Sequence, residues 1–342
     1  MKAVQIVKPN ELKIIDMEKP VIDAENNVLV KIRASGICGS DVGIYHGTNA
    51  AATYPRVIGH EIVGEIVETG SGVTTRKVGD RVIIDQVTAC GKCYACRKGR
   101  LNVCQHLAVR GVHIDGGYRE YMAVPEKDCY PLPDFLEYKD AVMIEPTTIA
   151  VQCCSRAQLE AEDDVLIIGA GALGSSLLRI VKLFKPHSII MADIDQARLD
   201  DALKNGATAV INPKNEDLVA RAKELTGGYG PTVTIDAACV KGSLLSACQA
   251  AGNATRVMTM GFSVAPDEIN QFVITSKELD IRGSRLQNRK FAEVIKLVNE
   301  GKVELRGTVS HTFPFLEAQK AFDFVDSRDP SIRKVALIRT GE

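Results

Sequence analysis

The chain has 342 residues, of which 45% are apolar and 25% charged, and its formal net charge is −1. These values are typical of a soluble globular protein long enough for two domains. The balanced charge argues against a nucleic-acid partner, and no apolar run is long enough to cross a membrane. Residues 1–9 lack the long apolar segment of a signal peptide. We therefore expect a cytoplasmic protein whose ten cysteines serve as metal ligands or free thiols.

The first part of the chain is typical of short strands. Residues 28–34 have a strong β pattern, and residues 62–67 and 81–84 are further strand candidates. Turn signals separate these runs, among them Gly70 and Gly72. Short strands divided by such turns predict a β-rich, barrel-like domain.

Three possible metal ligands lie within residues 36–61. Cys38 stands between glycines, and His60 and Glu61 follow Gly59 directly. A thiolate, an imidazole and a carboxylate together favour zinc, and three protein ligands with one open position describe a catalytic zinc site. The alternative is a buried cysteine beside an unrelated surface His-Glu pair.

A second cluster contains four cysteines within 15 residues, at Cys90, Cys93, Cys96 and Cys104. Four thiolates in one tight loop predict a closed tetrahedral zinc site that orders the chain without catalysing a reaction. Two disulfides are the alternative, disfavoured in a reducing compartment. An iron–sulfur cluster fits less well, because the spacings match neither ferredoxin pattern.

Two further polar residues stand in unusual positions. His113 lies in a glycine-bearing turn, where it either lines a pocket or sits on a surface loop. Glu145 lies among apolar residues directly before Pro146, at the start of a helical stretch over residues 141–157. A carboxylate there is costly to bury unless it is paired or bound to a metal.

The sequence changes character near residue 163. An apolar run at residues 163–168 predicts a buried strand, and residues 175–184 predict a helix. Gly169, Gly171 and Gly174 lie between them, which is the glycine spacing of a dinucleotide-binding turn in its required setting. The glycines allow the backbone to approach a pyrophosphate at the helix N-terminus.

The acidic residue that such a turn needs is also present. The next predicted strand, residues 188–192, is followed by Asp193, which comes 19 residues after Gly174. A carboxylate at this position accepts hydrogen bonds from both ribose hydroxyls and repels a 2′-phosphate. The sequence therefore predicts NAD in preference to NADP.

The α/β alternation continues beyond this turn. Helices are expected at residues 198–205, 216–225 and 241–250, and strands at residues 209–211, 233–236, 256–260 and 279–282. This order predicts a doubly wound parallel sheet. Helices at 291–299 and 316–325 and a strand at 334–338 then return to the first domain.

Taken together, these motifs resemble one family over essentially the whole chain. The segments are Gly36-Ile37-Cys38-Gly39-Ser40-Asp41, Gly59-His60-Glu61, the four-cysteine loop, Ile144-Glu145-Pro146 and the Gly169–Gly174 turn. Their order is similar to that in zinc-containing medium-chain alcohol dehydrogenases of the polyol branch. The resemblance implies an α/β protein with a GroES-like catalytic domain at 1–147 and 283–342 and an inserted Rossmann domain at 148–282.

The resemblance also implies roles for individual residues. Cys38, His60 and Glu61 would bind a catalytic zinc, Glu145 would bind the same metal directly or through water, and Ser40 would begin a proton relay. The four-cysteine loop would hold a structural zinc, giving two zinc ions per subunit. The set expected to bind NAD⁺ comprises Gly169, Gly171, Leu173, Gly174, Asp193 and Arg198.

Closer resemblances concern the substrate. Residues 54–61, 111–117 and 283–286 look like those of bacterial dehydrogenases that oxidise C5 of sugar acids, including the starvation-sensing type. We therefore expect oxidation of L-gulonate or L-galactonate to a keto acid such as D-fructuronate. Arg285, His113 and Tyr45 are candidate substrate residues, and a guanidinium suits a carboxylate or several hydroxyls. Sorbitol-type polyol or threonine oxidation is the alternative within this class.

One position departs from the family pattern. Many alcohol dehydrogenases carry a histidine five residues after the zinc cysteine as the outer end of the relay, whereas this chain has Gly43. Tyr45 or His46 could replace it, or protons could leave through water.

Two other function classes remain open from the sequence. A zinc-independent quinone or enoyl reductase shares these folds but lacks the metal ligands. A non-catalytic regulatory protein on a dehydrogenase scaffold is the second. For the family member we expect a homodimer or homotetramer acting on a small molecule.

Overall fold

The computed structural model describes residues 1–262 and 266–339. The chain folds into two compact units, Met1–Glu145 with Phe291–Glu342, and Pro146–Lys290. Residues 283–290, which we expected in the first domain, belong to the second unit. The reason is that the last strand of its sheet runs to Gly283, and the Ser284 amide still donates to the Thr259 carbonyl at 2.9 Å.

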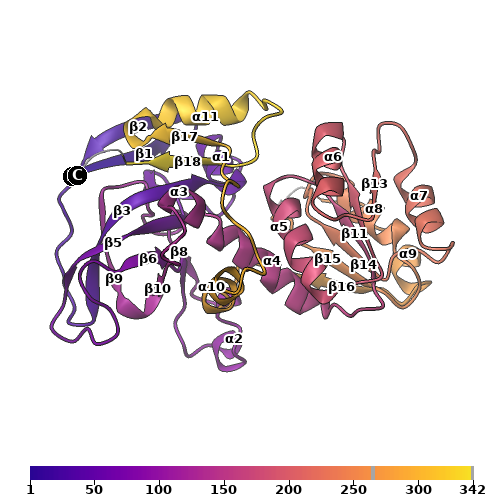
Figure 1. The fold of residues 1–342 in the computed structure, drawn as a ribbon, viewed down its shortest axis with the longest axis horizontal. Coiled ribbons are helices and arrows are strands. Elements are labelled where there is room, and N and C mark those ends of the chain that lie inside the picture. Colours follow the sequence, from indigo (N-terminus) through magenta and orange to yellow (C-terminus); the bar gives the residue numbers. More distant parts are fainter. Residues whose placement is uncertain (263–265, 340–342) are drawn as a thin grey trace. The chain divides into compact units, whose positions relative to one another are not determined.

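The first unit is built on a seven-stranded sheet with the order β10-β6-β5-β3-β18-β17, in which β9 also pairs with β3 (Figure 1). Its strands are β3 (Asn27–Ile37), β5 (Glu61–Thr69), β6 (Arg81–Ile84), β9 (Tyr121–Pro125), β10 (Cys129–Pro131), β17 (His311–Pro314) and β18 (Val335–Ile338). A second sheet has the order β2-β1-β4, and β7 pairs with β8. These strands are β1 (Lys2–Lys8), β2 (Glu11–Asp16), β4 (Arg56–Val57), β7 (Val87–Thr88) and β8 (Ala108–Val109).

The helices of the first unit are short. They are α1 (Gly39–Tyr45), α2 (Tyr94–Arg97), α3 (Tyr138–Ala141), α10 (Phe291–Asn299) and α11 (Ala318–Asp326). Helix α1 follows β3 directly, so the chain turns from strand to helix at Cys38. The first metal-ligand candidate therefore lies at the end of a central strand.

One face of β3 contributes to the core of this unit. Val28, Val30 and Ile32 point to one face and pack with apolar residues of β5, β6 and β9. The register of β3 and β5 then shifts between Ile32 and Ala34, which is the signature of a β-bulge. After the shift, Gly36 lies opposite Glu61.

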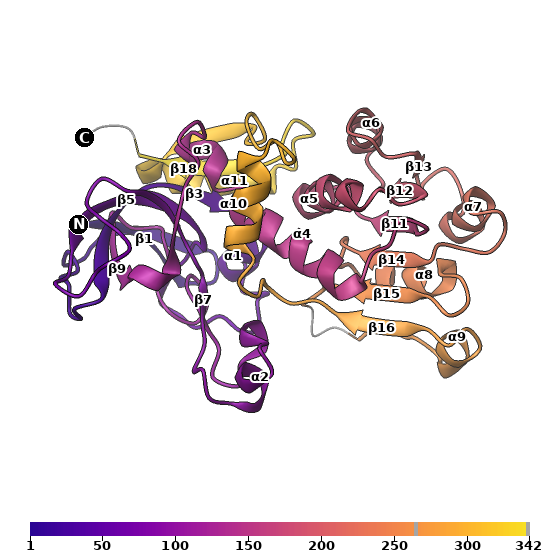
Figure 2. The same cartoon turned by 60° about the horizontal axis from the view of Figure 1, so that its bottom comes forward.

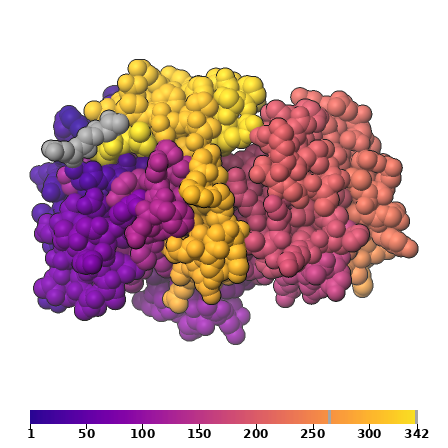
Figure 3. All heavy atoms as spheres, in the orientation of Figure 1, coloured from indigo at the N-terminus to yellow at the C-terminus, as the bar shows by residue number. Residues whose placement is uncertain are grey.

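The C-terminal segment completes the same sheet. Strand β18 pairs antiparallel with β3, with Val335 opposite Ile37 and Ala336 opposite Gly36. In Figure 3 the yellow atoms of the C-terminal segment lie against the indigo and violet atoms of the N-terminal part. Residues about 300 positions apart in the sequence therefore meet beside Cys38.

The second unit has a six-stranded parallel sheet of order β13-β12-β11-β14-β15-β16, with helices on both faces (Figure 2). Its strands are β11 (Asp164–Ile168), β12 (Ser188–Ala192), β13 (Ala209–Ile211), β14 (Val233–Asp236), β15 (Arg256–Thr259) and β16 (Asp280–Gly283). Its helices include α4 (Ile144–Ala157), α5 (Ala172–Val181), α6 (Gln196–Lys204), α7 (Leu218–Leu225), α8 (Ser243–Ala250) and α9 (Gln271–Thr275). This is the strand order of a doubly wound dinucleotide-binding fold.

Most expected elements lie within a few residues of their predicted bounds, and the strand at 188–192 has the bounds that were expected. The predicted helix over 141–157 is wrong at its start, because α3 ends at Ala141 and α4 begins at Ile144. Pro146 lies in the first turn of α4, the one place where a helix tolerates proline. Within residues 1–262 and 266–339, no helix is long and apolar enough to span a bilayer.

Candidate active site and metal centres

Cys38, His60 and Glu61 come together at one point in the first unit. One ligand atom from each lies within 4.8 Å of the other two. Cys38 is half-buried at the N-cap of α1, and His60 and Glu61 are buried where β5 begins. A tetrahedral zinc needs such atoms about 3.3–3.8 Å apart, as its bonds of about 2.0–2.3 Å require, so small side-chain shifts would close the set around an ion.

Glu61 is a fully buried carboxylate with one oxygen paired and one unpaired. Oε1 accepts a hydrogen bond from Lys334 Nζ at 2.5 Å, and both side chains are almost completely buried. Oε2 is buried without a hydrogen-bond partner. A buried carboxylate oxygen is costly to leave unsatisfied, so this oxygen fits a metal ligand.

Gly36 makes room for that oxygen. A Cβ atom added to Gly36 would lie 1.7 Å from Glu61 Oε2 and 3.1 Å from Lys334 Cε. Because Gly36 is paired directly with Glu61 across the sheet, only a glycine fits here.

The Asp41 carboxylate connects the ligand segment that contains Cys38 with the one that contains His60 and Glu61. It is fully buried and accepts hydrogen bonds from the amides of Cys38 at 2.9 Å and Gly59 at 3.3 Å. Its Oδ1 also lies 3.4 Å from His60 Nδ1, which has no partner with hydrogen-bond geometry. Burial by itself lowers the pKa of His60, but Asp41 and Cys38 outweigh it and hold the pKa well above its usual value.

Glu145 is buried near the cluster but lies outside its group of ligand atoms. Its carboxylate accepts a hydrogen bond from the fully buried Gln86 side chain. Burial raises the pKa of Glu145 to about 8, while His60 opposes and Glu61 adds to the shift. Glu145 is thus a buried carboxylate beside the three ligand candidates, and its binding of the metal, directly or through water, stays a prediction.

The proposed relay begins at Ser40, a half-buried residue in α1. Tyr45 and His46, the two candidates for its outer end, both make other contacts. The Tyr45 hydroxyl accepts a hydrogen bond from Gln319 at 3.1 Å, and its ring packs on Phe322.

Both ring nitrogens of His46 are also engaged. Nδ1 lies 2.9 Å from Asn10 Oδ1, and Nε2 lies 2.9 Å from Asp326 Oδ2 in α11. His46 is thus part of a surface contact with the C-terminal helix. The idea that it replaces the missing histidine at Gly43 is not supported by these contacts.

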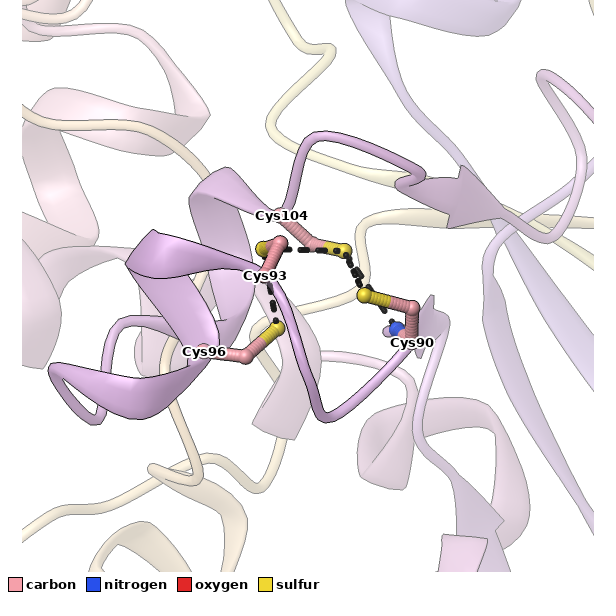
Figure 4. A group of neighbouring side chains, drawn as sticks. All are labelled: Cys90, Cys93, Cys96 and Cys104. Carbon is pink, nitrogen blue, oxygen red and sulfur yellow. Dashed lines mark hydrogen bonds between the residues drawn. The ribbon is translucent and has the colours of Figure 1, made fainter.

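The four-cysteine loop is drawn in Figure 4, with the thiols of Cys90, Cys93, Cys96 and Cys104 converging. Neighbouring sulfur atoms are 3.4, 3.5 and 3.8 Å apart, and all ten cysteines, each within the described residues, are unbridged. Tetrahedral zinc with bonds of about 2.3 Å places its sulfur atoms about 3.8 Å apart. The spacing therefore fits a zinc ion and excludes disulfides, whose sulfur atoms are about 2.05 Å apart.

Backbone amides in this loop donate hydrogen bonds that stabilise cysteine thiolates. The amides of Cys90 and His106 both donate to Cys104 Sγ at 3.3 Å. Hydrogen bonds from the backbone of Cys96 and Gln105 lower the pKa of Cys93 to about 6. Gly91 and Gly99 have φ values of +74° and +72°, which lets the chain fold back around the site.

In the second unit the glycine turn has the geometry that a pyrophosphate requires. Gly169 has a φ of +103°, and a Cβ atom on Gly174 would lie 1.8 Å from the Gly169 carbonyl oxygen. Gly171 is the N-cap of α5, so free amides of the helix start directly after it, at Ala172 and Leu173.

Asp193 lies beside this turn, after β12. Its Oδ2 accepts a hydrogen bond from the Ala170 amide at 2.6 Å, and its Oδ1 accepts one from the Asp195 amide at 2.9 Å. Arg198 in α6 pairs with Asp195 at 3.5 Å. These contacts tie the acidic residue to the glycine turn, as ribose recognition requires.

The two substrate candidates outside α1 lie in different units. Arg285 stacks on Phe262 at 4.7 Å in the second unit, and burial lowers its pKa. His113 is half-buried in the first unit, where its Nδ1 faces the Val109 amide at 3.1 Å. Because that amide donates, the neutral ring carries its proton on Nε2 and can itself donate from there.

Comparison with known proteins agrees with this organisation. Residues 24–134 match the alcohol dehydrogenase GroES-like domain, and residues 172–300 match the zinc-binding dehydrogenase family. The starvation-sensing protein RspB of Escherichia coli strain K12 is 41% identical over 338 residues, covering 98% of this chain and 99% of that protein. L-galactonate-5-dehydrogenase of the same strain is 31% identical over 325 residues, covering 94% and 95% of the two chains.

A solved structure of similar sequence has the same fold. The crystal structure of an alcohol dehydrogenase encoded by rspB in Escherichia coli CFT073, complexed with NADH, superposes with a TM-score of 0.93. It is 41% identical, and the match covers 99% of both chains.

The chain belongs to the zinc-binding alcohol dehydrogenase family. It is a zinc-type, NAD(H)-linked oxidoreductase, and the predicted α/β class with a GroES-like domain and a Rossmann domain is confirmed.

The site contains residues whose roles the sequence did not indicate. Lys334 pairs with Glu61 from 273 positions away, and no local motif marks it. Asp41 Oδ1 lies 3.4 Å from His60 Nδ1, and the Gln86 side chain donates to Glu145. Asp41 stands within the ligand motif and so had a signal, whereas the contact of Lys334 follows from the pairing of β18 with β3, and that of Gln86 from a loop meeting the start of α4.

Proposed function

We propose that this protein oxidises a secondary hydroxyl of a sugar acid, with L-gulonate or L-galactonate as the best candidate substrate and C5 as the reacting carbon. The product would be a keto acid such as D-fructuronate. The observation that carries the dehydrogenase assignment is the cluster of half-buried Cys38 with buried His60 and Glu61, in a chain with a complete dinucleotide turn. The relative named L-galactonate-5-dehydrogenase supports the substrate class.

The residues present suit the two groups that this reaction needs. When bound, zinc supplies a Lewis acid that lowers the pKa of a hydroxyl group, and NAD⁺ supplies the hydride acceptor. Cys38, His60 and Glu61 would hold the metal, with Glu145 beside them, and the four-cysteine loop would hold the structural zinc.

The other residues near the site have separate roles in this proposal. Ser40 would take the proton of the substrate hydroxyl on its Oγ and pass it outward. Lys334 fixes one oxygen of Glu61 and leaves the other free for the ion. Arg285 would bind the substrate carboxylate, and His113 would donate from Nε2 to a substrate hydroxyl. Tyr45 is the third substrate candidate, and its hydroxyl accepts a hydrogen bond from Gln319 and has its own proton to donate.

Initial rates test this proposal directly. NADH formation is measured with L-gulonate, L-galactonate, other aldonates, sorbitol and L-threonine, for the wild type and for Cys38→Ser. We expect the highest kcat/KM for one of the first two acids and loss of activity in the variant. Preference for sorbitol or threonine would replace the substrate assignment. No turnover by zinc-loaded protein on any of them would favour the regulatory class. Light scattering would test the expected homodimer or homotetramer.

A further inference from the structure

Tyr118 is a fully buried residue in the loop that precedes β9. Its amide donates to the Ile58 carbonyl at 3.0 Å, and its carbonyl accepts from the Val4 amide at 2.8 Å. The backbone of Tyr118 is therefore fixed to the segment that leads into His60, two residues before that ligand.

The side chain of Tyr118 reaches the other ligand segment. Its hydroxyl donates to the Gly36 carbonyl at 3.1 Å, two residues before Cys38, and lies 3.5 Å from Asp41 Oδ2. Its ring fills the space beside Gly59, since a Cβ atom there would lie 2.2 Å from the ring. The ring also meets Phe322 edge-on, at 6.4 Å between centroids.

We propose that Tyr118 is a positioning residue that sets the separation of the Cys38 and His60 segments and thereby the metal affinity of the cluster. This inference rests on the proposed role of Cys38, His60 and Glu61 as metal ligands. One rigid ring bridges the two strand ends, with its backbone held at Ile58 and its hydroxyl at Gly36. Substituting an outer partner of a metal site typically weakens metal binding by about 10–100-fold.

The hydroxyl acts as a fixed donor and not as a proton carrier. Burial, with Asp41, Glu61 and Cys38 nearby, raises the pKa of Tyr118 well above its usual value. The phenol therefore stays protonated and keeps donating to the Gly36 carbonyl across the working pH range.

Tyr118→Phe tests the proposal, with Tyr54→Phe as the matched control. Tyr54 also donates its hydroxyl to a backbone carbonyl, that of Ile44 at 2.5 Å, but Ile44 lies at the far end of α1, six residues after Cys38. Zinc affinity is measured by competition with a chelator, and Cys38→Ser gives the zinc held by the four-cysteine loop alone. We expect Tyr118→Phe to weaken binding at the cluster roughly 10–100-fold and Tyr54→Phe to leave it unchanged.

A second readout reports geometry and not stability. Cobalt in place of zinc gives absorption bands that depend on ligand arrangement, and we expect these bands to shift in Tyr118→Phe and not in Tyr54→Phe. Unchanged affinity and bands, with a lowered melting temperature in both variants, would show a merely structural role. If the wild type binds no more zinc than Cys38→Ser, the proposed function itself fails.

Should Tyr118→Phe not fold, 3-fluorotyrosine at position 118 keeps the ring shape and strengthens the donor. Shifted cobalt bands would then support the inference, and bands identical to those of the wild type would overturn it.

Discussion

Replacing Gly36 with alanine should disable the catalytic metal site by displacing Glu61. The added Cβ would lie 1.7 Å from Glu61 Oε2, and real Cβ atoms essentially never approach closer than 3.0 Å. The oxygen would have to move by about 1.3 Å, the difference between these two distances. Lys334 opposes this movement, because its Nζ holds the other oxygen of Glu61 at 2.5 Å. The Cε atom of Lys334 would itself lie 3.1 Å from the new Cβ atom.

The cost can be worked from these contacts. Overpacking of a buried site costs about 1–3 kcal/mol. If Glu61 instead turns away from Lys334, a buried ion pair is broken, which costs about 3–5 kcal/mol. Either response moves the one oxygen that is free to bind a metal, so we expect zinc affinity at the cluster to fall at least about tenfold, or about 1.4 kcal/mol.

Gly39→Ala is the matched control for this variant. Gly39 lies next to Cys38 in the first turn of α1, and a Cβ atom added there would meet nothing within 4 Å. Urea unfolding of the chelated proteins and zinc competition of the loaded ones are measured in parallel. If Gly36→Ala matched Gly39→Ala in both, the close approach of Glu61 to the β3 backbone would not matter, and our interpretation of this site would be refuted.

Three further outcomes follow from the same contacts. Lys334→Met leaves the buried Glu61 carboxylate unpaired, so it should destabilise chelated protein by about 3–5 kcal/mol and zinc-loaded protein by less; equal losses in urea unfolding would contradict this. Asp193→Ser removes the repulsion of a 2′-phosphate, so the ratio of kcat/KM for NADP⁺ over NAD⁺ should rise at least about tenfold; an unchanged ratio would remove Asp193 from cofactor choice. The pKa of Cys93 is lowered to about 6, so in chelated protein we expect Cys93 to be the cysteine that is alkylated fastest above pH 6. Below pH 6 its alkylation should be slow. Cys129, whose pKa burial raises to about 12, should stay unmodified at pH 8 by peptide mass spectrometry; equal labelling would refute both assignments.

Local signals explain why much of the site could be predicted from the sequence. Cys90 to Cys104 lie within 15 residues, so spacing alone brings the thiols together. The dinucleotide turn is equally local, because the helix α5 starts directly after β11 and the glycines that join them. In both cases the chain has little freedom to place these residues elsewhere.

The environment of the catalytic cluster could not be predicted in the same way. Lys334 reaches Glu61 because β18 pairs with β3, and Gly36 faces Glu61 because of the register shift near Ile32. A one-residue change of register would turn these side chains to the other face of the sheet. Neither pairing leaves a pattern in the sequence, so the partners of the ligands follow only from the fold.

The two metal centres therefore differ in what their geometry depends on. The four-cysteine loop is fixed by a short piece of chain and its own amides, so its affinity for zinc should be nearly independent of the sheet. The cluster at Cys38 depends on β3, β5 and β18 together, because a lysine from the C-terminal segment holds one oxygen of its carboxylate and the other oxygen is unpaired. With three protein ligands, the proposed catalytic site would leave one position of a tetrahedral zinc open for a substrate, which a closed four-thiolate site cannot provide.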